Sequence, residues 1–251
     1  MARSAYLTGG RTGGTSAPVT LALDSAGLAC SAVVAVGETI LNAERVEDRH
    51  GQAETLLPIV DAVMRGAGLA PAALTLVAVS VGPGSFTGIR VGLAAARGIA
   101  LATNAGIVGV SNFEAVAAGL SASDRHDLRH ILVALESRRE DIYVQFFDHA
   151  CNPVGHPAAV MPAALGEMVS DRIGAAPVLL AGDAAHRAAS ALSHRADITV
   201  RDGSAPDAAG VLLAGLRRRS IIEGDEPQPL YLRPPDVTVS NRWRTSPVGR
   251  G

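Results

Sequence analysis

The order of apolar segments along the chain constrains its fold more than any other feature. Three short apolar runs follow one another with only brief turns between them, which is typical of an antiparallel meander. A helical pattern, a continuous apolar run, a glycine loop, a second helix, another buried strand and a third helix come next. We expect these elements at 19–24, 30–36, 39–46, 53–67, 76–81, 87–103 and 107–110, with Ser111 as the N-cap of the third helix.

A shortened version of this order recurs in the second half of the chain. It begins with a hairpin and continues with a helix, a strand and a final helix, expected at 131–135, 142–147, 162–172, 178–180 and 208–222. The repetition predicts an α/β fold of two similar subdomains with a cleft between them. We therefore assign a flexible tail to 1–18, an N-terminal subdomain to 19–125, a C-terminal subdomain to 126–235 and a second flexible tail to 236–251.

Composition excludes several kinds of chemistry. All 22 basic residues are arginine, so the chain has no lysine for a Schiff base or for a phosphate-binding loop of the Walker type. The formal net charge of -2 does not provide the dense positive field of an autonomous nucleic-acid-binding protein. Neither a signal peptide nor an apolar run of about 20 residues is evident, and only two cysteines are present. We expect a cytoplasmic, reduced protein without a membrane segment.

The loop Gly82-Pro-Gly-Ser-Phe-Thr-Gly88 is the first candidate site, because a loop between a buried strand and a helix can present backbone N–H groups to a phosphate. A tight strand-to-helix turn capped by Ser85 explains the same spacing. A dinucleotide fingerprint would need an acidic residue after the next strand, where Ser111-Asn112 stand. Asp24, at the end of the first strand, could hold a phosphate-bound magnesium ion or cap the turn. A nucleotide site here would use Asp24, Ser25, Gly82, Gly84, Ser85 and Arg138.

Two further features are weaker candidates. The equivalent loop of the second half, Glu136-Ser-Arg-Arg139, has no glycine and carries two guanidinium groups, so only half of a phosphate clamp is visible. His126 and His130 have the spacing of a metal pair on a helix, but a strand begins at residue 131 and no third ligand is evident. A solvent-facing position explains both histidines more simply.

The stretch Val79-Ser-Val-Gly-Pro-Gly-Ser-Phe-Thr-Gly-Ile-Arg-Val-Gly92 resembles the glycine-loop motif of the TsaB (YeaZ) family, a bacterial subunit of the machinery that makes threonylcarbamoyladenosine in tRNA. The resemblance covers nearly all of 19–236. Further similar segments are Leu23-Asp-Ser25, Ala29-Cys-Ser31, His50 to Pro58, Gly109-Val-Ser111, Glu136 to Tyr143 and Pro229 to Asp236. The resemblance implies two actin-like subdomains of the ribonuclease H-like type, the second shortened, in agreement with the repetition described above.

The resemblance also implies a role without chemistry. In the related catalytic subunit TsaD, a His-x-x-x-His metal pair follows the strand after the glycine-loop helix, whereas Asn112 and Val116 stand at the matching positions here. An amide and an isopropyl group cannot replace two imidazole ligands. The implied chain therefore has no catalytic residue and no metal site, and it binds no cofactor alone. ATP, magnesium and the metal ion are expected on partner subunits.

The implied partners are the catalytic paralogue TsaD and the ATPase subunit TsaE, with a homodimer when the chain is alone and tRNA bound only through the complex. The implied function is a non-catalytic scaffold for transfer of a threonylcarbamoyl group to N6 of the tRNA adenosine beside the anticodon. The alternative is a free-standing actin-like enzyme that binds ATP and acts on a small metabolite. The incomplete loop at 136–139 favours the scaffold.

The helix at 87–103 is apolar or small on nearly every side, with Arg90 and Arg97 together on one narrow face. Such a helix is either buried within its own subdomain or covered on one face by a partner. In the similar family, the first two helices form the dimer surface. The predicted interface residues are Leu56, Val60, Val63, Gly88, Ile89, Arg90, Gly92, Leu93, Ala96 and Arg97.

Overall fold

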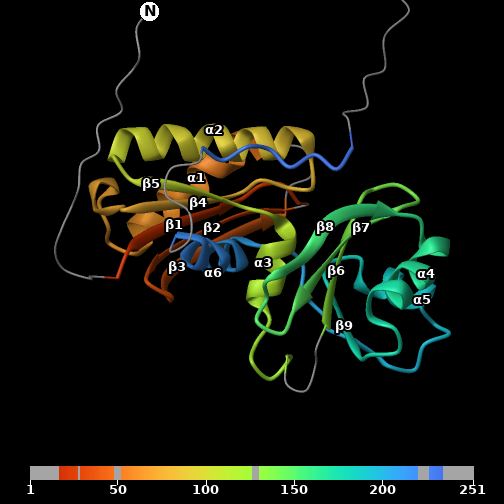
Figure 1. The fold of residues 1–251 in the computed structure, drawn as a ribbon. Coiled ribbons are helices and arrows are strands. Elements are labelled where there is room, and N and C mark those ends of the chain that lie inside the picture. Colours follow the sequence, from red (N-terminus) through yellow and green to blue (C-terminus); the bar gives the residue numbers. More distant parts are fainter. Residues whose placement is uncertain (1–16, 28, 48–51, 126–129, 220–225, 234–251) are drawn as a thin grey trace, which may run out of the picture.

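The structure is a computed structural model that describes residues 17–27, 29–47, 52–125, 130–219 and 226–233. Two five-stranded mixed sheets lie side by side, each flanked by helices (Figure 1). The repetition that the sequence predicts is therefore confirmed. The predicted tails at 1–18 and 236–251 lie outside the described residues, except for residues 17 and 18, and so does His126.

The first sheet has the order β3-β2-β1-β4-β5. The first three strands form an antiparallel meander, and β4 and β5 join β1 in parallel. Strands buried on both faces, such as β4, read as continuous apolar runs because helices cover both sides of the sheet. The strands are β1 (Val19–Asp24), β2 (Ala29–Val36), β3 (Thr39–Glu47), β4 (Leu76–Ser80) and β5 (Gly106–Val110).

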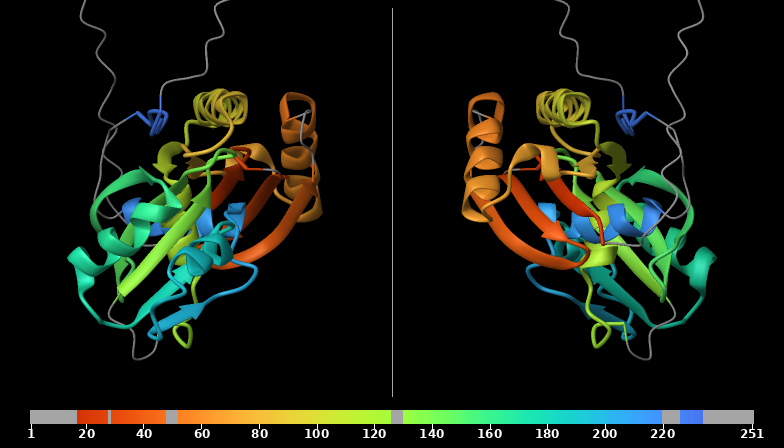
Figure 2. Two further views of the ribbon diagram at one scale, coloured as in Figure 1. Left: turned by 90° about the vertical axis from the view of Figure 1, so that its right-hand side faces the viewer. Right: turned by 90° about the vertical axis from the view of Figure 1, so that its left-hand side faces the viewer.

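Helices α1 (Gln52–Gly66) and α2 (Phe86–Thr103) cover one face of this sheet, with a short 3-10 turn at Pro71–Ala73 between them in sequence (Figure 2). Helices α3 (Asn112–Gly119) and α6 (Ala208–Arg219) cover the opposite face. As predicted, Ser111 caps α3: its side chain accepts a hydrogen bond from the Glu114 N–H, and Glu114 bonds back to the Ser111 N–H.

The second sheet repeats the order of the first, as β10-β9-β6-β7-β8. Its strands are β6 (His130–Glu136), β7 (Ile142–Asp148), β8 (Pro153–Val160), β9 (Val178–Ala181) and β10 (Ile198–Val200). Helices α4 (Pro162–Ile173) and α5 (Ala185–Ala191) pack on one face. Strands β8 and β10 and helix α5 are absent from the elements expected above, because β8 contains proline and glycine and the other two are too short for a clear period.

Helix α3 holds the two sheets together. Its Ala115 and Ala118 pack with α6 on the first sheet, whereas Phe113, Val116 and Ala117 pack against the second. Helix α6 lies on the first sheet, although its residues belong to the range expected for the C-terminal subdomain, 126–235. The chain therefore returns to the first sheet after β10, since the apolar face of α6 matches the surface left open beside α3.

Candidate functional site at the junction of the two sheets

The glycine loop between β4 and α2 packs tightly against the turn that follows β1. A Cβ atom at Gly84 would overlap the Ala26 carbonyl oxygen, and one at Gly88 would overlap that of Ser25. The Ser85 N–H donates to the Ala26 carbonyl at 2.7 Å, and the Ser25 hydroxyl donates to the Gly88 carbonyl at 2.8 Å. These glycines thus let two backbones approach each other, rather than leaving space for a phosphate.

Ser85 supplies the helix cap that the sequence predicts. Its hydroxyl oxygen accepts a hydrogen bond from the Gly88 N–H at 3.2 Å. Gly82 has a φ of 103° and lies close to the Leu230 carbonyl, so a side chain there would be strained and crowded. This geometry is that of a tight strand-to-helix turn capped by Ser85, and not that of a loop that presents its N–H groups to a phosphate.

Asp24 lies at the end of β1 with 2% of its surface exposed. One carboxylate oxygen accepts hydrogen bonds from the Ser80 hydroxyl at 2.5 Å and from the Ala26 N–H at 3.1 Å. Burial raises the pKa of the Asp24 carboxyl above its ordinary value of 3.8, and these two hydrogen bonds lower it by a smaller amount. The buried Asp24 carboxylate therefore stabilises the turn between β1 and β2 through these hydrogen bonds.

The corresponding loop of the second sheet is held by Arg187 on α5. Its guanidinium pairs with Glu136 at 2.8 Å and also donates to the backbone carbonyls of Arg139 and Glu140. Asp183 accepts a hydrogen bond from the Glu136 N–H at 2.9 Å, and burial raises the pKa of the Asp183 carboxyl. The acidic and basic side chains at this loop are thus paired with each other and with its backbone. A phosphate-binding loop would instead keep its backbone N–H groups free for the ligand.

The structure does bring the six predicted nucleotide-site residues to the junction of the two sheets. Five belong to the contact between the first turn and the glycine loop, and Arg138 points across from the second hairpin toward the Gly27 carbonyl at 3.4 Å. The N–H groups of Ala26, Ser85 and Gly88 already have partners within the chain. These three N–H groups are therefore not available to a phosphate.

The segment 226–233 crosses the junction and ties together three parts of the structure. Arg97 on α2 pairs with Glu226 at 2.9 Å and donates to the Pro227 carbonyl at 2.8 Å. The Leu230 N–H donates to the Val81 carbonyl at 2.8 Å. Arg233 pairs at 2.6 Å with Asp141, whose side chain is 2% exposed. In the sequence, only the family resemblance of Pro229 to Asp236 marks this segment, because its contacts are with residues distant in the chain.

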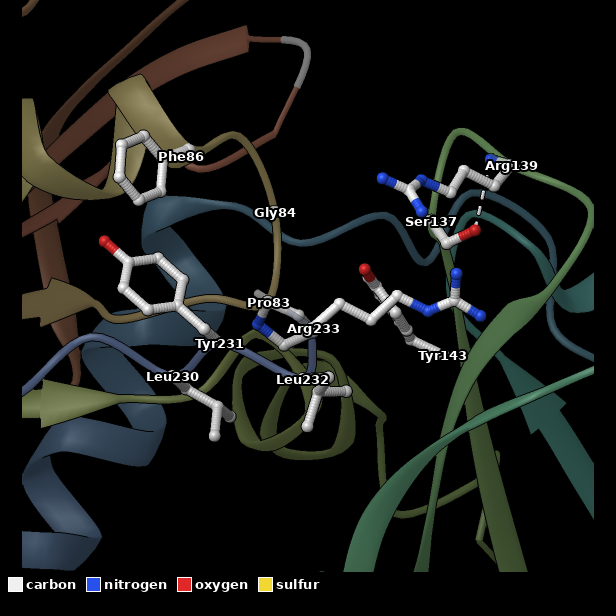
Figure 3. Close-up of a pocket in the computed structure, with 10 residues that line it drawn as sticks. All are labelled: Pro83, Gly84, Phe86, Ser137, Arg139, Tyr143, Leu230, Tyr231, Leu232 and Arg233. Atoms are coloured by element: carbon white, nitrogen blue, oxygen red, sulfur yellow. Dashed lines mark hydrogen bonds between the residues drawn. The ribbon is translucent and has the colours of Figure 1, made fainter. Parts of the chain in front are cut away.

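A cavity of about 160 Å³ opens beside this segment (Figure 3). It lies between the glycine loop and the hairpin of β6 and β7. Tyr231 and Phe86 stack on one side, with their ring centroids 5.2 Å apart, and Arg233 extends across toward Tyr143. The lining residues are Pro83, Gly84, Phe86, Ser137, Arg139, Tyr143, Leu230, Tyr231, Leu232 and Arg233. The volume is below the roughly 300–1,000 Å³ of a pocket that encloses a whole ligand.

A larger groove of about 860 Å³ lies between β5, α3, β8 and the segment 226–230. Its main cation is already neutralised, since Arg218 pairs with Glu114 at 3.2 Å and donates to the Gly109 carbonyl at 2.8 Å. Gly109 lets the segment approach, because a Cβ there would come within 2.9 Å of Pro227. Arg218 and Gly109 therefore already serve contacts within the protein.

The predicted interface residues need correction. Eight of the ten are buried within the first subdomain, where α1 and α2 pack on the sheet: Leu56, Val60, Val63, Gly88, Ile89, Gly92, Leu93 and Ala96. Arg97 is half-buried against the segment 226–233, and Arg90 is exposed with its guanidinium 3.7 Å above the Phe86 ring. Sequence periodicity could not decide which flank of so apolar a helix faces the sheet.

The exposed stripe of α2 is the opposite flank. It consists of small or apolar residues apart from Arg90, and Leu101 has 83% of its surface exposed. Leu57 is 54% exposed on the neighbouring α1. The exposed residues of this stripe are Thr87, Arg90, Ala94, Gly98, Leu101 and Ala102.

The positions that match the metal pair of the catalytic relative are buried. Asn112 is 2% exposed and donates from its side-chain amide to the Pro83 carbonyl at 2.9 Å, and Val116 lies in the core between α3 and the second sheet. His130 begins β6. Within the described ranges, no cluster of three or more histidine, cysteine or acidic residues could hold a metal ion. None of the described helices is long and apolar enough to cross a membrane.

Two sheets with the same order, three antiparallel strands followed by two parallel ones, define a protein of the actin-like, two-subdomain class. YeaZ from Pseudomonas aeruginosa has this fold too, with a TM-score of 0.72 at 24% identity over 86% of this chain and 100% of that chain. The family model for TsaD, tRNA N6-adenosine threonylcarbamoyltransferase, matches residues 44–158.

Two relatives extend the comparison. The tRNA threonylcarbamoyladenosine biosynthesis protein TsaB of Haemophilus influenzae is 32% identical over 49% of this chain and 51% of its own length. An uncharacterized protein of Mycobacterium tuberculosis is 32% identical over 86% of this chain and 92% of its own length. The chain belongs to the TsaB (YeaZ) family. Its similarity spans about half the length of the Haemophilus TsaB.

Proposed function

We propose that this protein is a non-catalytic subunit in threonylcarbamoyladenosine biosynthesis. It pairs with a catalytic TsaD-type paralogue that transfers the threonylcarbamoyl group to N6 of the tRNA adenosine beside the anticodon. ATP, magnesium and the catalytic metal ion belong to the partner subunits, and a TsaE-type ATPase completes the complex. The Haemophilus relative supports this pathway, and so does the tRNA threonylcarbamoyladenosine biosynthesis protein TsaB of Escherichia coli, which is 28% identical over 61% of this chain and 65% of its own length.

Two features of the junction support a role without chemistry. The packed glycine loop and the neutralised second hairpin leave no phosphate clamp, which also argues against a free-standing ATP-dependent enzyme. The side chains of Asn112 and Val116 make contacts inside the protein. At the matching positions, a metal-dependent relative needs two imidazole ligands.

The exposed stripe of α2 carries the proposal of pairing. A helix on a subdomain surface normally presents mostly charged or polar residues to water, yet apart from Thr87 and Arg90 this one presents alanine, glycine and leucine. Small residues allow close approach of a second helix, and the strongly exposed Leu101 gains about 1.5–3 kcal/mol when it is covered. We propose that a helix pair of the catalytic paralogue covers the stripe, and that a second copy of this chain does so when the paralogue is absent.

Gly98 provides the test, because nothing lies within 4 Å of a Cβ atom added there. We expect Gly98→Arg to fold normally and to lose pairing with the TsaD-type protein of the source organism in copurification and sedimentation. Gly119→Arg is the matched control, since Gly119 is an exposed helical glycine on α3 whose Cβ also meets nothing. Threonylcarbamoyl transfer to tRNA by the reconstituted complex should fall with Gly98→Arg and persist with Gly119→Arg.

Normal pairing of Gly98→Arg, measured at equal thermal stability, would rule out this surface. Transfer of threonylcarbamoyl groups to tRNA by the isolated chain would rule out the non-catalytic role.

A further inference from the structure

The exposed stripe of α2 carries one charge, that of Arg90. Its other exposed members are uncharged, and most of them are small. Arg97, further along the same helix, already pairs with Glu226 at 2.9 Å. Within the described ranges, by contrast, no acidic side chain forms an ion pair with Arg90. The positive charge of Arg90 is therefore not balanced by a described carboxylate.

An aromatic ring holds the Arg90 side chain in place. The guanidinium carbon lies over the Phe86 ring, 3.7 Å from its centroid. Tyr231 packs against the same ring, with the two centroids 5.2 Å apart, so the segment 226–233 supports Phe86 (Figure 3). A cation–π contact orders a guanidinium but does not neutralise its charge, so the N–H donors still favour an anion. Arg90 is thus oriented before a partner binds.

Pairing through this stripe places the charge of Arg90 in a largely apolar contact. Arg90 lies on the same stripe as Gly98, and the helical rise of 1.5 Å per residue separates the two by about 12 Å along α2. A helix that covers Gly98 and Leu101 therefore also removes water from around Arg90. A guanidinium that loses its water costs free energy unless an anion pairs with it and accepts its hydrogen bonds. The covering partner must supply that anion.

We infer that Arg90 binds an aspartate or glutamate side chain of the TsaD-type paralogue, through two parallel N–H···O hydrogen bonds, and thereby determines which protein pairs with this chain. The inference rests on the proposed function. A second copy of α2 cannot supply the carboxylate, because this helix contains no acidic residue. A paralogue with an acidic residue at the matching position is therefore favoured over the homodimer.

The test measures binding of the full chain to the TsaD-type protein of the source organism by surface plasmon resonance. Arg90→Gln should raise Kd at least about thirtyfold, mainly through faster dissociation, as expected when one member of a buried charge pair is removed. Arg90→Lys keeps the charge without the planar fork and should recover only part of the affinity. Arg172→Gln is the matched control and should leave Kd unchanged. Arg172 is also an exposed arginine over an aromatic ring, 5.5 Å from the centroid of Phe146, but it belongs to α4 of the second subdomain.

Two further variants examine how Arg90 acts. Phe86→Leu should weaken pairing less than Arg90→Gln does, and it should have no further effect when Arg90→Gln is already present, because Phe86 acts by orienting Arg90. Arg90→Glu reverses the charge and identifies the partner residue. Replacing the exposed acidic residues of the paralogue by arginine, one at a time, should restore pairing with Arg90→Glu at one position. Circular dichroism checks that each variant is folded, as expected for an exposed side chain such as Arg90.

Gly98→Arg separates this inference from the pairing proposal. Lost pairing with Gly98→Arg and normal pairing with Arg90→Gln would overturn the inference and keep the pairing surface. Weakened pairing with Arg90→Gln and normal pairing with Gly98→Arg would support the Arg90 contact and refute the surface around Gly98. Normal pairing of both variants, or no pairing of the wild type, would overturn both proposals. The inference also fails if Arg172→Gln weakens pairing as much, or if Arg90→Gln weakens self-association of the isolated chain to the same extent.

Discussion

Two glycines of α2 allow a direct test of why the glycine motif exists. Gly88 and Gly98 occupy the same helix, so replacing either by alanine gains about 1 kcal/mol of helix propensity. At Gly98 the new methyl group meets nothing, and we expect a net stabilisation of about 1 kcal/mol. At Gly88 the methyl group overlaps the Ser25 carbonyl oxygen, whose backbone cannot move away freely.

The cost at Gly88 has two parts. Forcing α2 away from the turn after β1 costs about 1–3 kcal/mol, as in other overpacked sites. The same displacement breaks the buried hydrogen bond from Ser25 to the Gly88 carbonyl, which contributes about 1 kcal/mol. After the gain in helix propensity, Gly88→Ala should destabilise the protein by about 1–3 kcal/mol. For a chain of this size, that lowers the melting temperature by roughly 2–12 °C.

Urea and thermal unfolding of both variants, followed by circular dichroism, provide the measurement. Each should be run at two protein concentrations, because self-association makes the melting temperature depend on concentration. Opposite signs for the two variants support a packing role for the motif. If Gly88→Ala is as stable as Gly98→Ala, the turn and the helix do not need this contact, and the motif has no packing role.

Three further predictions follow from the junction. Burial raises the pKa of the Asp24 carboxyl in the folded protein, so protonated Asp24 contributes stability below about pH 3.8, and this contribution is lost as the pH rises through the folded-state pKa. Asp24→Asn should therefore be more stable than the wild type at pH 7. Urea unfolding at several pH values should show this difference in stability shrinking in acid. A variant less stable than the wild type at pH 7 would contradict this. Arg233→Met leaves the Asp141 carboxylate without its cation and should cost about 1–3 kcal/mol in urea unfolding, most of which Asp141→Asn in the same chain should restore. Calorimetric titration of the isolated chain with magnesium-ATP should show no micromolar binding, and such binding would refute the packed-loop interpretation.

Much of the fold was predictable because its signals are local. Apolar runs buried on both faces, the change to helical spacing, and the caps at Ser85 and Ser111 depend on neighbouring residues in the chain. The repeated order of elements then indicated two similar sheets. Short or proline-containing elements such as β8 and β10 lacked such a signal.

The tertiary structure decided the rest, since it depends on which distant surfaces fit together. An almost wholly apolar α2 can place either flank on a sheet, and the turn at Ser25 selects the flank with Gly88 and Gly92. That choice leaves the stripe around Gly98 open to solvent. In the same way, α6 packs on the first sheet, and the segment 226–233 places Tyr231 against Phe86. No spacing pattern in the sequence relates the residues that form these contacts.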